Sequence, residues 1–311
     1  MTSQRALEPL PDPGLLLIRG LGHSGSTLLD LALGAHPQVL GLGEVARLIR
    51  QPLPDEQGKG PAQLRGAGRF VRRCTCGESA ADCPLWGGFL DWLIDHDQLG
   101  DLDKFLELIA RAKVLGLTQA ADGRSVPLRW IVESYQGDVV LPGPLKQALH
   151  PRPVKVLFLV RDVRSWVHSE ARRSKGNRRC PGLRAVLRWW RVNRRIEREL
   201  RACGCDIFTL GYEEMALAPE STFRRLCDWL DLPYDQKMLT PGVATRSHIV
   251  SGNRMRNDPK RSSRIVYDGT WLSSSSFVLR AVLAWPPLAA MNSRLVYGQM
   301  LLGKSWPQRS K

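Results

Sequence analysis

The sequence predicts an α/β protein built on a parallel sheet, because an apolar strand followed directly by a turn and a helix occurs twice. The first unit begins with the apolar run at residues 15–18 and continues through a loop into an apolar helix at 28–33. The second begins with VKVLFLV, residues 154–160, and continues into a helix for which Asp162 is the cap and Ser165 lies near N3. Ligands of open α/β sheets bind outside the carboxyl ends of the strands, so both units should face one crevice.

The loop between the first strand and its helix is rich in glycine and hydroxyl groups. Its members are Gly20, Gly22, Gly25, Ser24, Ser26 and Thr27. This arrangement aims backbone N–H groups and the positive end of a helix dipole at one anion. An ordinary strand-to-helix turn would also carry glycines, but three hydroxyls at the helix N-terminus favour a phosphate or sulfate site.

The same loop lacks the lysine of a nucleotide-hydrolysing P-loop. That motif reads G-x-x-x-x-G-K-[ST], and its Lys reaches the β- and γ-phosphates. Here Ser26 stands at the Lys position, and no Lys occurs between residues 1 and 58. A triphosphate–magnesium site is therefore disfavoured, and a small-molecule kinase with an atypical P-loop is kept as an alternative.

Two segments together resemble the sulfotransferases that use 3′-phosphoadenosine-5′-phosphosulfate (PAPS), in the Golgi-type and bacterial branch that includes the protein-tyrosine sulfotransferases. GHSGSTLL, residues 22–29, is similar to the family's 5′-phosphosulfate loop. LVRDVRSWVHS, residues 159–169, is similar to its 3′-phosphate motif, in which Arg161 and Ser169 would grip the donor. The resemblance implies an α/β, P-loop-like three-layer fold with a central, mostly parallel sheet and helical insertions.

The resemblance also implies a set of site residues. AHPQVLGLGE, residues 35–44, is similar to the stretch that ends in the family's general base, which would be Glu44. The implied donor site comprises Gly22, His23, Ser24, Gly25, Ser26, Thr27, Arg161 and Ser169, with Tyr212 and Arg256 as secondary members. PAPS is the implied cosubstrate, and no metal is implied for the transfer, because a sulfuryl group carries less charge than a phosphoryl group.

The chain departs from the family pattern at its catalytic cations. Many members carry Arg or Lys where this chain has His23, which could serve as a protonated or neutral hydrogen-bond donor. Arg19 is the nearest alternative cation, and Glu133 or His23 is the next candidate for the base after Glu44. Because the cations are altered, a second alternative is a catalytically impaired transferase scaffold that binds a nucleic acid or a partner.

The charge balance fits a polyanionic ligand. The 311 residues carry a formal net charge of +15, and residues 161–201 hold 14 Lys and Arg against four Asp and Glu. A basic cleft would concentrate PAPS, which carries about four negative charges. The same charge balance would arise from a solvated helical face, from an arginine-rich genome, or from a basic stripe that binds nucleic acid. Nucleic acid is disfavoured, because Trp189 and Trp190 fit the apolar face of a helix and are expected in the core.

Three of the seven cysteines are closely spaced. Cys74, Cys76 and Cys83 resemble part of a zinc motif, but three thiols without a nearby fourth ligand fall short of a structural site. No metal is therefore expected, and the redox or metal state of these thiols is left open. No signal peptide precedes the first strand, and the apolar region at 277–302 is interrupted by Arg and Pro. These features predict a cytoplasmic, bacterial protein without a membrane span, and leave peripheral membrane contact by the C-terminal segment open.

Along the chain, an α/β domain is expected over residues 1–276 and a C-terminal helical extension over 277–311. Within the domain, 51–68 is expected to be a surface loop or insertion, 86–117 a helical cap over the acceptor side, and 174–180 a polar break. The predicted reaction is in-line sulfuryl transfer to a hydroxyl or amine. The acceptor stays open between a small molecule, a sugar, a lipid and a peptide tyrosine.

Overall fold

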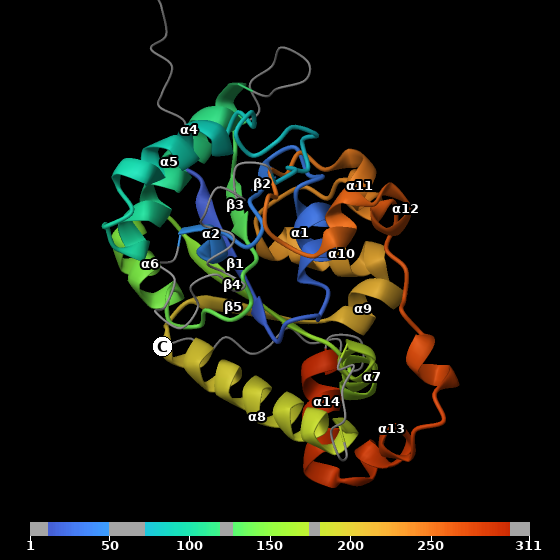
Figure 1. Cartoon of the computed structure of the whole chain (residues 1–311). Coiled ribbons are helices and arrows are strands. Elements are labelled where there is room, and N and C mark those ends of the chain that lie inside the picture. The colour runs from blue at the N-terminus through green and yellow to red at the C-terminus, as the bar shows by residue number, and fades with distance from the viewer. Residues whose placement is uncertain (1–11, 50–71, 119–126, 174–180, 299–311) are drawn as a thin grey trace, which may run out of the picture.

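A single parallel sheet organises the computed structural model, which describes residues 12–49, 72–118, 127–173 and 181–298. The strands are β1 (Gly14–Gly20), β2 (Val39–Gly41), β3 (Trp130–Glu133), β4 (Val154–Val160) and β5 (Asp206–Gly211). Their order in the sheet is β2-β3-β1-β4-β5, and every pairing among them is parallel (Figure 1). The predicted α/β class with a central parallel sheet is confirmed.

Helices cover both faces of the sheet. The longer ones are α1 (Ser26–Leu33), α4 (Trp86–Asp95), α5 (Asp101–Thr118), α6 (Pro142–Leu149), α7 (Val163–Arg173), α8 (Pro181–Ala202), α10 (Pro219–Trp229) and α14 (Pro286–Val296). The shorter ones are α2 (Ala46–Ile49), α9 (Tyr212–Leu217), α11 (Pro241–Ala244), α12 (Pro259–Ser262) and α13 (Phe277–Ala281), with 3-10 turns η3 (Gln236–Leu239), η4 (Arg254–Asn257), η5 (Thr270–Ser273) and η6 (Val282–Ala284).

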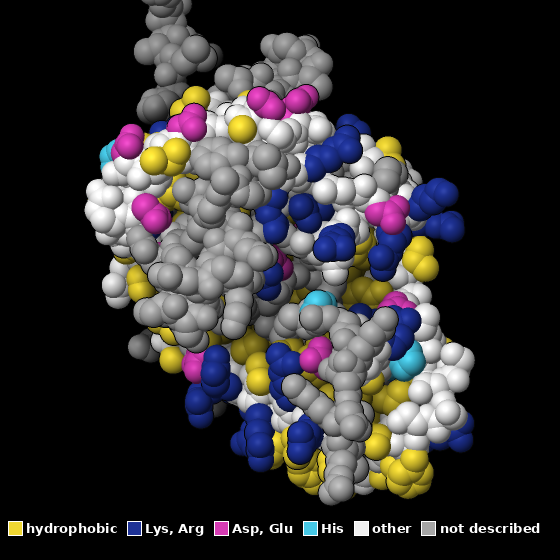
Figure 2. Space-filling view, viewed as in Figure 1, with side chains coloured by type: hydrophobic (Ala, Val, Ile, Leu, Met, Phe, Trp, Pro, Cys, Tyr) yellow, Lys and Arg dark blue, Asp and Glu magenta, His cyan; other side chains and the backbone are white. Residues whose placement is uncertain are grey.

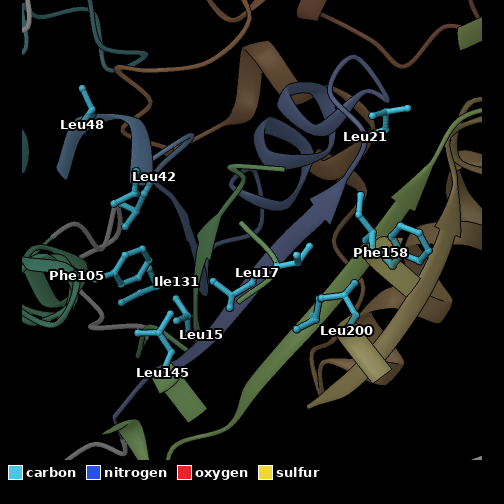
Figure 3. Close-up of a cluster of buried hydrophobic side chains, with 14 of the residues drawn as sticks. Leu15, Leu17, Leu21, Leu42, Leu48, Phe105, Ile131, Leu145, Phe158 and Leu200 are labelled. Carbon is cyan, nitrogen blue, oxygen red and sulfur yellow. The ribbon is translucent and has the colours of Figure 1, made fainter. Parts of the chain in front are cut away.

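Alternate residues of β1 divide the apolar core into two layers. Leu15 and Leu17 join the larger cluster, to which α4, α5, α6 and α8 contribute (Figure 3). Leu16 and Ile18 join the smaller cluster on the other face, with side chains from α1, α9 and α10. Because successive side chains of a strand point to opposite faces, an all-apolar strand must be covered on both sides. The two clusters confirm the three-layer arrangement.

β1 lies in the middle of the sheet and carries the glycine-rich loop at its carboxyl end. Leu17 pairs with Glu133 of β3 on one side, and Arg19 pairs with Phe158 of β4 on the other. A Cβ atom on Gly20 would lie only 2.2 Å from the Leu159 carbonyl oxygen, so the last residue of β1 has no room for a side chain. This close approach places the loop directly beside the end of β4.

Two helices, α4 and α5, occupy the segment expected as a helical cap. The expected surface loop at 51–68 and the polar break at 174–180 lie outside the described residues. Trp189 is fully buried as expected, whereas Trp190 is half-buried with its ring centroid 4.9 Å from that of Trp285.

The C-terminal helix α14 packs against the start of α7. Asn292 Nδ2 donates to Asp162 Oδ2 over 3.0 Å, and the Tyr297 hydroxyl lies 2.9 Å from the same oxygen. Asp162 in turn accepts the Arg164 backbone N–H at 2.8 Å, which confirms it as the cap of α7. None of the helices in the described ranges has the length and apolar character needed to cross a membrane.

Candidate active site

The glycine-rich loop curls at two left-handed residues before α1 begins. His23 has φ of +71° and Gly25, the N-cap of α1, has φ of +98°. The Ser24 hydroxyl donates to the Leu21 carbonyl oxygen over 2.6 Å, which holds the turn from within. Successive backbone N–H groups in such a turn form an anion-binding concavity at the positive end of the helix. His23 is exposed, whereas Ser24, Ser26 and Thr27 are buried.

The Tyr212 ring packs against Gly25 of this loop. A Cβ atom on Gly25 would lie 2.7 Å from Cδ2 of the Tyr212 ring, so only glycine permits the ring to pack there. The Tyr212 hydroxyl lies 3.1 Å from the Val266 carbonyl oxygen and accepts the Asp268 backbone N–H at 3.2 Å. Tyr212 therefore links the loop to the segment at 266–268.

Arg161, at the carboxyl end of β4, contacts the glycine-rich loop. Its Nη1 donates to the His23 carbonyl oxygen over 3.3 Å, and its Nε donates to the Ser165 hydroxyl over 2.8 Å. The guanidinium carbon lies 4.8 Å from the centroid of the Tyr212 ring. The two motifs recognised in the sequence thus meet at the ends of adjacent strands. Ser169 lies two turns along α7 from Arg161 and is half-buried.

Asp268, which the sequence analysis did not identify, forms an ion pair with the Arg161 guanidinium. Its Oδ2 accepts from Arg161 Nη2 over 2.8 Å. Burial raises the pKa of Asp268, but hydrogen bonds from Thr270 and Arg161 outweigh that effect and hold the pKa at about 2. The carboxylate is therefore charged at neutral pH and pre-positions the guanidinium beside the loop.

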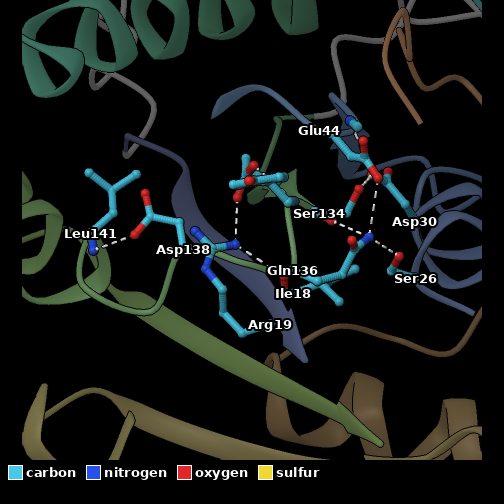
Figure 4. Close-up of polar contacts among 12 residues, drawn as sticks. Ile18, Arg19, Ser26, Asp30, Glu44, Ser134, Gln136, Asp138 and Leu141 are labelled. Carbon is cyan, nitrogen blue, oxygen red and sulfur yellow. Dashed lines mark hydrogen bonds and ion pairs between the residues drawn. The ribbon is translucent and has the colours of Figure 1, made fainter. Parts of the chain in front are cut away.

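Glu44 lies after β2 and is connected to the glycine-rich loop through Gln136. Gln136 Nε2 donates to Glu44 Oε1 over 3.3 Å and also donates to the Ser26 hydroxyl (Figure 4). The Glu44 side chain is buried and forms an ion pair with Arg47 Nε at 2.9 Å. Gln136 follows β3, so the carboxyl ends of β1, β2 and β3 all contribute to this group.

A second carboxyl group, Asp30 of α1, lies beside Glu44 and was also missed by the sequence reasoning. Its Oδ2 accepts from the Ser134 hydroxyl at 2.7 Å and from the Gly43 backbone N–H at 3.1 Å (Figure 4). Burial raises the pKa of Asp30 to about 7, against the lowering effect of these hydrogen bonds. In the sequence, Asp30 is distinguished only as the single charged residue of α1.

Arg19 is bound inside the sheet and does not face the loop. Its Nη1 lies 2.5 Å from Glu133 Oε2, and both side chains are completely buried. Burial raises the pKa of Glu133 in spite of the neighbouring guanidinium. The expectation that Arg19 is the alternative cation is therefore wrong, and the same pairing argues against Glu133 as a base. Both side chains belong to central strands and expose no surface to solvent.

Thr27 and Arg256 are joined through one loop. The Thr27 hydroxyl accepts the Asn253 backbone N–H at 3.2 Å. Arg256 donates to four carbonyl oxygens of the same loop, those of Ile249 at 3.2 Å, Val250 at 2.7 Å, Gly252 at 3.0 Å and Asn253 at 3.3 Å. In this structure the Arg256 guanidinium holds the loop at 249–253 and reaches the glycine-rich loop through it.

The basic residues of α8 lie on its outer face. The arginines at 184, 188, 191, 194, 195, 198 and 201 are exposed, and several pair with glutamates, including Arg188 with Glu170 at 2.9 Å. On the visible face of the molecule, Lys and Arg are spread over several elements and do not gather in a single patch (Figure 2). Much of the local positive charge is therefore a solvated helical surface.

The three closely spaced cysteines do have a fourth neighbour. The ligand atoms of Cys74, Cys76, Cys83 and His248 all lie within 4.8 Å of one another. The expectation that the thiols lack a fourth ligand is wrong, because the fold brings His248 to them from a distant part of the chain. This cluster lies outside the group formed by Glu44, Ser26 and Arg161.

Residues 142–236 match the family model described as "Sulfotransferase family". Over this segment, which is just under a third of its length, the chain is similar to the sulfotransferase family. The matched segment contains β4, Arg161, Ser169 and Tyr212, and the resemblance noted in the sequence is thereby confirmed. This assignment supports a sulfotransferase. A search of the curated proteins finds no significant match.

Bacterial sulfotransferases are among the solved structures to which the chain is similar. The sulfotransferase domain of the Synechococcus PCC 7002 olefin synthase is 18% identical, with 99% of this chain and 100% of that chain covered and a TM-score of 0.48. A sulfotransferase from Mycobacterium avium is 17% identical, with 91% and 76% covered and a TM-score of 0.44. A sulfotransferase from Alicyclobacillus acidocaldarius is 15% identical, with 93% and 97% covered and a TM-score of 0.38.

Proposed function

We propose that the chain is a PAPS-dependent sulfotransferase that moves a sulfuryl group to a hydroxyl or amine acceptor by in-line displacement. One observation carries the proposal: the Arg161 guanidinium contacts the backbone of the glycine-rich loop, with Nη1 3.3 Å from the His23 carbonyl oxygen. An arginine and a helix N-terminus then converge on one place, at the carboxyl ends of neighbouring strands. A nucleotide with anionic groups at both its 3′ and 5′ positions would engage both.

The loop and Arg161 have separate roles in this proposal. Backbone N–H groups of the loop, with the hydroxyls of Ser26 and Thr27, bind the phosphosulfate at the 5′ end of the donor. Arg161 and Ser169 bind the 3′-phosphate, for which a guanidinium fork is well suited. His23, exposed at the bend of the loop, donates a hydrogen bond to the bridging oxygen. No metal is given a role in the transfer.

Glu44 is the proposed general base. It takes the proton of the acceptor hydroxyl or amine while the new bond to sulfur forms and the bond from sulfur to the phosphate oxygen breaks. Charge then builds on the leaving 3′,5′-ADP, where the fixed donors of the loop stabilise it. The Gln136 amide orients Glu44 Oε1 over 3.3 Å and bonds to Ser26, so base and donor loop are held in one arrangement.

Donor selectivity tests the proposal. Thermal unfolding is measured with 3′,5′-ADP, 5′-AMP, ATP with Mg²⁺, and an oligonucleotide; a ligand at 100 times its Kd should add roughly 2.7 kcal/mol of stability. We expect 3′,5′-ADP to stabilise the protein far more than 5′-AMP, because only the former carries the 3′-phosphate. Arg161→Ala should abolish that difference, while Arg224→Ala, which removes an exposed arginine on α10, should preserve it.

Three outcomes would contradict the proposal. Equal stabilisation by 3′,5′-ADP and 5′-AMP would remove the role given to Arg161 and Ser169. A larger effect of ATP with Mg²⁺ would favour a kinase, and a larger effect of the oligonucleotide would favour a nucleic-acid-binding scaffold.

A further inference from the structure

Cys74, Cys76, Cys83 and His248 stand as close together as the ligands of a bound metal ion. The Sγ atoms of Cys74 and Cys83 are 3.7 Å apart. The Nδ1 atom of His248 lies 3.2 Å from Cys83 Sγ and 3.9 Å from Cys74 Sγ. All four ligand atoms fall within 4.8 Å of one another.

The separations among Cys74, Cys83 and His248 are close to those of tetrahedral zinc. With Zn–S of about 2.3 Å and Zn–N of about 2.0 Å, two sulfurs of a tetrahedron lie about 3.8 Å apart, and a sulfur and a nitrogen about 3.5 Å apart. Three thiolates and an imidazole are typical ligands of zinc, whereas magnesium and calcium prefer oxygen ligands. We propose that Cys74, Cys76, Cys83 and His248 bind a structural Zn²⁺ ion.

The backbone around the cysteines is folded so that their side chains come close together. A tight turn carries the first two cysteines: the Gly77 N–H donates to the Cys74 carbonyl at 3.1 Å, and the Cys74 N–H donates to the Glu78 carbonyl at 2.8 Å. Gly77 has φ of +103°, a conformation that other residues rarely adopt. Cys83 lies just before α4. Cys74, Cys83 and His248 are buried and Cys76 is exposed, so the ion would lie at the protein surface with Cys76 as its outer ligand.

Hydrogen bonds fix His248 against the cysteine loop independently of any ion. The Trp86 indole N–H donates to the His248 carbonyl oxygen over 2.6 Å, and the His248 N–H donates to the Gly41 carbonyl over 2.8 Å. The Thr75 hydroxyl donates to the Ser247 carbonyl oxygen and accepts the Ile249 N–H at 2.9 Å. The backbone that carries the His248 imidazole is therefore held at the residue itself and at both of its neighbours.

The ion would be structural because four protein ligands leave no open coordination position. It would clamp the segment at 72–86 to the segment at 247–256. The second segment holds the backbone of Glu44, whose N–H donates to the Ser251 carbonyl at 2.9 Å, and contacts Thr27 through the Asn253 N–H. Zinc binding does not depend on the proposed sulfuryl transfer, whereas an effect of zinc on turnover would rest on it.

Metal content of the full-length protein tests the proposal. The protein is purified under reducing conditions without a metal-affinity step, and zinc is measured by mass spectrometry; we expect one zinc per chain. Replacing zinc by Co²⁺ should give the intense visible absorption of tetrahedral thiolate-bound cobalt. A chelator should lower the midpoint of thermal unfolding, since removal of a ligand that binds only the folded chain destabilises it.

Cys76→Ser is the most informative variant, because its exposed thiol can be changed without disturbing the core. We expect at least a tenfold loss of zinc affinity, the scale seen when even outer-shell partners are disturbed. His248→Cys should retain zinc, since it replaces one ligand with another. Cys203→Ser, at a half-buried cysteine outside the cluster, is the matched control and should keep one zinc per chain.

The proposal would be overturned by protein that is folded and free of zinc and that shows no intense visible absorption when Co²⁺ is added. A disulfide between Cys74 and Cys83 in freshly isolated protein, detected by peptide mass, would overturn it as well. Neither result would bear on donor selectivity, so failure of the zinc site and failure of the proposed function can be told apart.

Discussion

The buried carboxyl group of Asp30 predicts how stability responds to pH near the candidate base. Burial raises its pKa from the ordinary 3.8 to about 7. A carboxyl group with a raised pKa holds its proton more tightly in the folded chain than in the unfolded chain. Its contribution to stability is complete below about pH 4 and is lost as the pH rises through 7.

The size of the effect is set by the two pKa values. Their separation, from 3.8 to about 7, corresponds to roughly 4 kcal/mol, at about 1.4 kcal/mol per pH unit. Between pH 5 and pH 7, Asp30 alone should cost the protein roughly 2–3 kcal/mol of unfolding free energy. Asp30→Asn keeps the shape of the side chain and does not titrate. The difference in unfolding free energy, variant minus wild type, should therefore rise by that amount over this range.

Urea unfolding followed by tryptophan fluorescence at pH 5, 6 and 7 measures this difference. Glu213, whose pKa burial also raises to about 7, is present in both proteins and cancels from the comparison. Glu213→Gln should show a rise of the same sign and serves as a positive comparison. A variant-minus-wild-type difference that stays constant from pH 5 to pH 7 would refute the reasoning.

Three further substitutions, together with one control at an exposed ion pair, test the site and the sheet. Thr27→Val removes the hydroxyl but keeps the volume, so turnover should fall more than 3′,5′-ADP affinity; unchanged turnover would leave the hydroxyl as a partner of Asn253 alone. Glu44→Gln should keep the fold and 3′,5′-ADP binding and lower the rate of transfer by ~10²–10⁴-fold; a folded and fully active variant would place the base elsewhere. Glu133→Gln leaves a buried guanidinium without its counter-ion and should cost about 3–5 kcal/mol in urea unfolding. Glu220→Gln, in an exposed ion pair on α10, should cost less than about 1 kcal/mol, and equal losses from the two would contradict the assigned burial.

The sequence predicted the elements whose signal is local. β1 and β4 contain the apolar runs at 15–18 and 156–160, and α4 and α5 carry helical periodicity, so each element is predictable from its own residues. The meeting of the glycine-rich loop with Arg161 was also expected, because parallel strands present their carboxyl ends at one edge. Features encoded by an apolar run, a helical period or the end of a parallel strand were therefore predictable from the sequence.

The rest of the site depends on contacts between distant segments. Gln136 and Asp268 carry no motif, and their roles arise only when β3 and the segment near η5 come beside the loop. Arg19 was a candidate for the catalytic cation because it follows an apolar run, but the central position of β1 buries it against Glu133. His248 is separated from the cysteines by most of the domain, so no local spacing could reveal it as their fourth neighbour.

The place of β1 in the sheet has a consequence for how the chain is made. Residues 14–20 are the earliest of the five strands to be synthesised, yet they pair only with residues 130–133 and 154–159. Until those strands leave the ribosome, an apolar segment that must be covered on both faces has no partner. Such non-local parallel pairing is slow, and exposed apolar strands associate with one another while they wait. A nascent chain that has not reached β4 is therefore a natural client for chaperones, and a fragment ending before residue 154 should be insoluble even though it contains the entire glycine-rich loop.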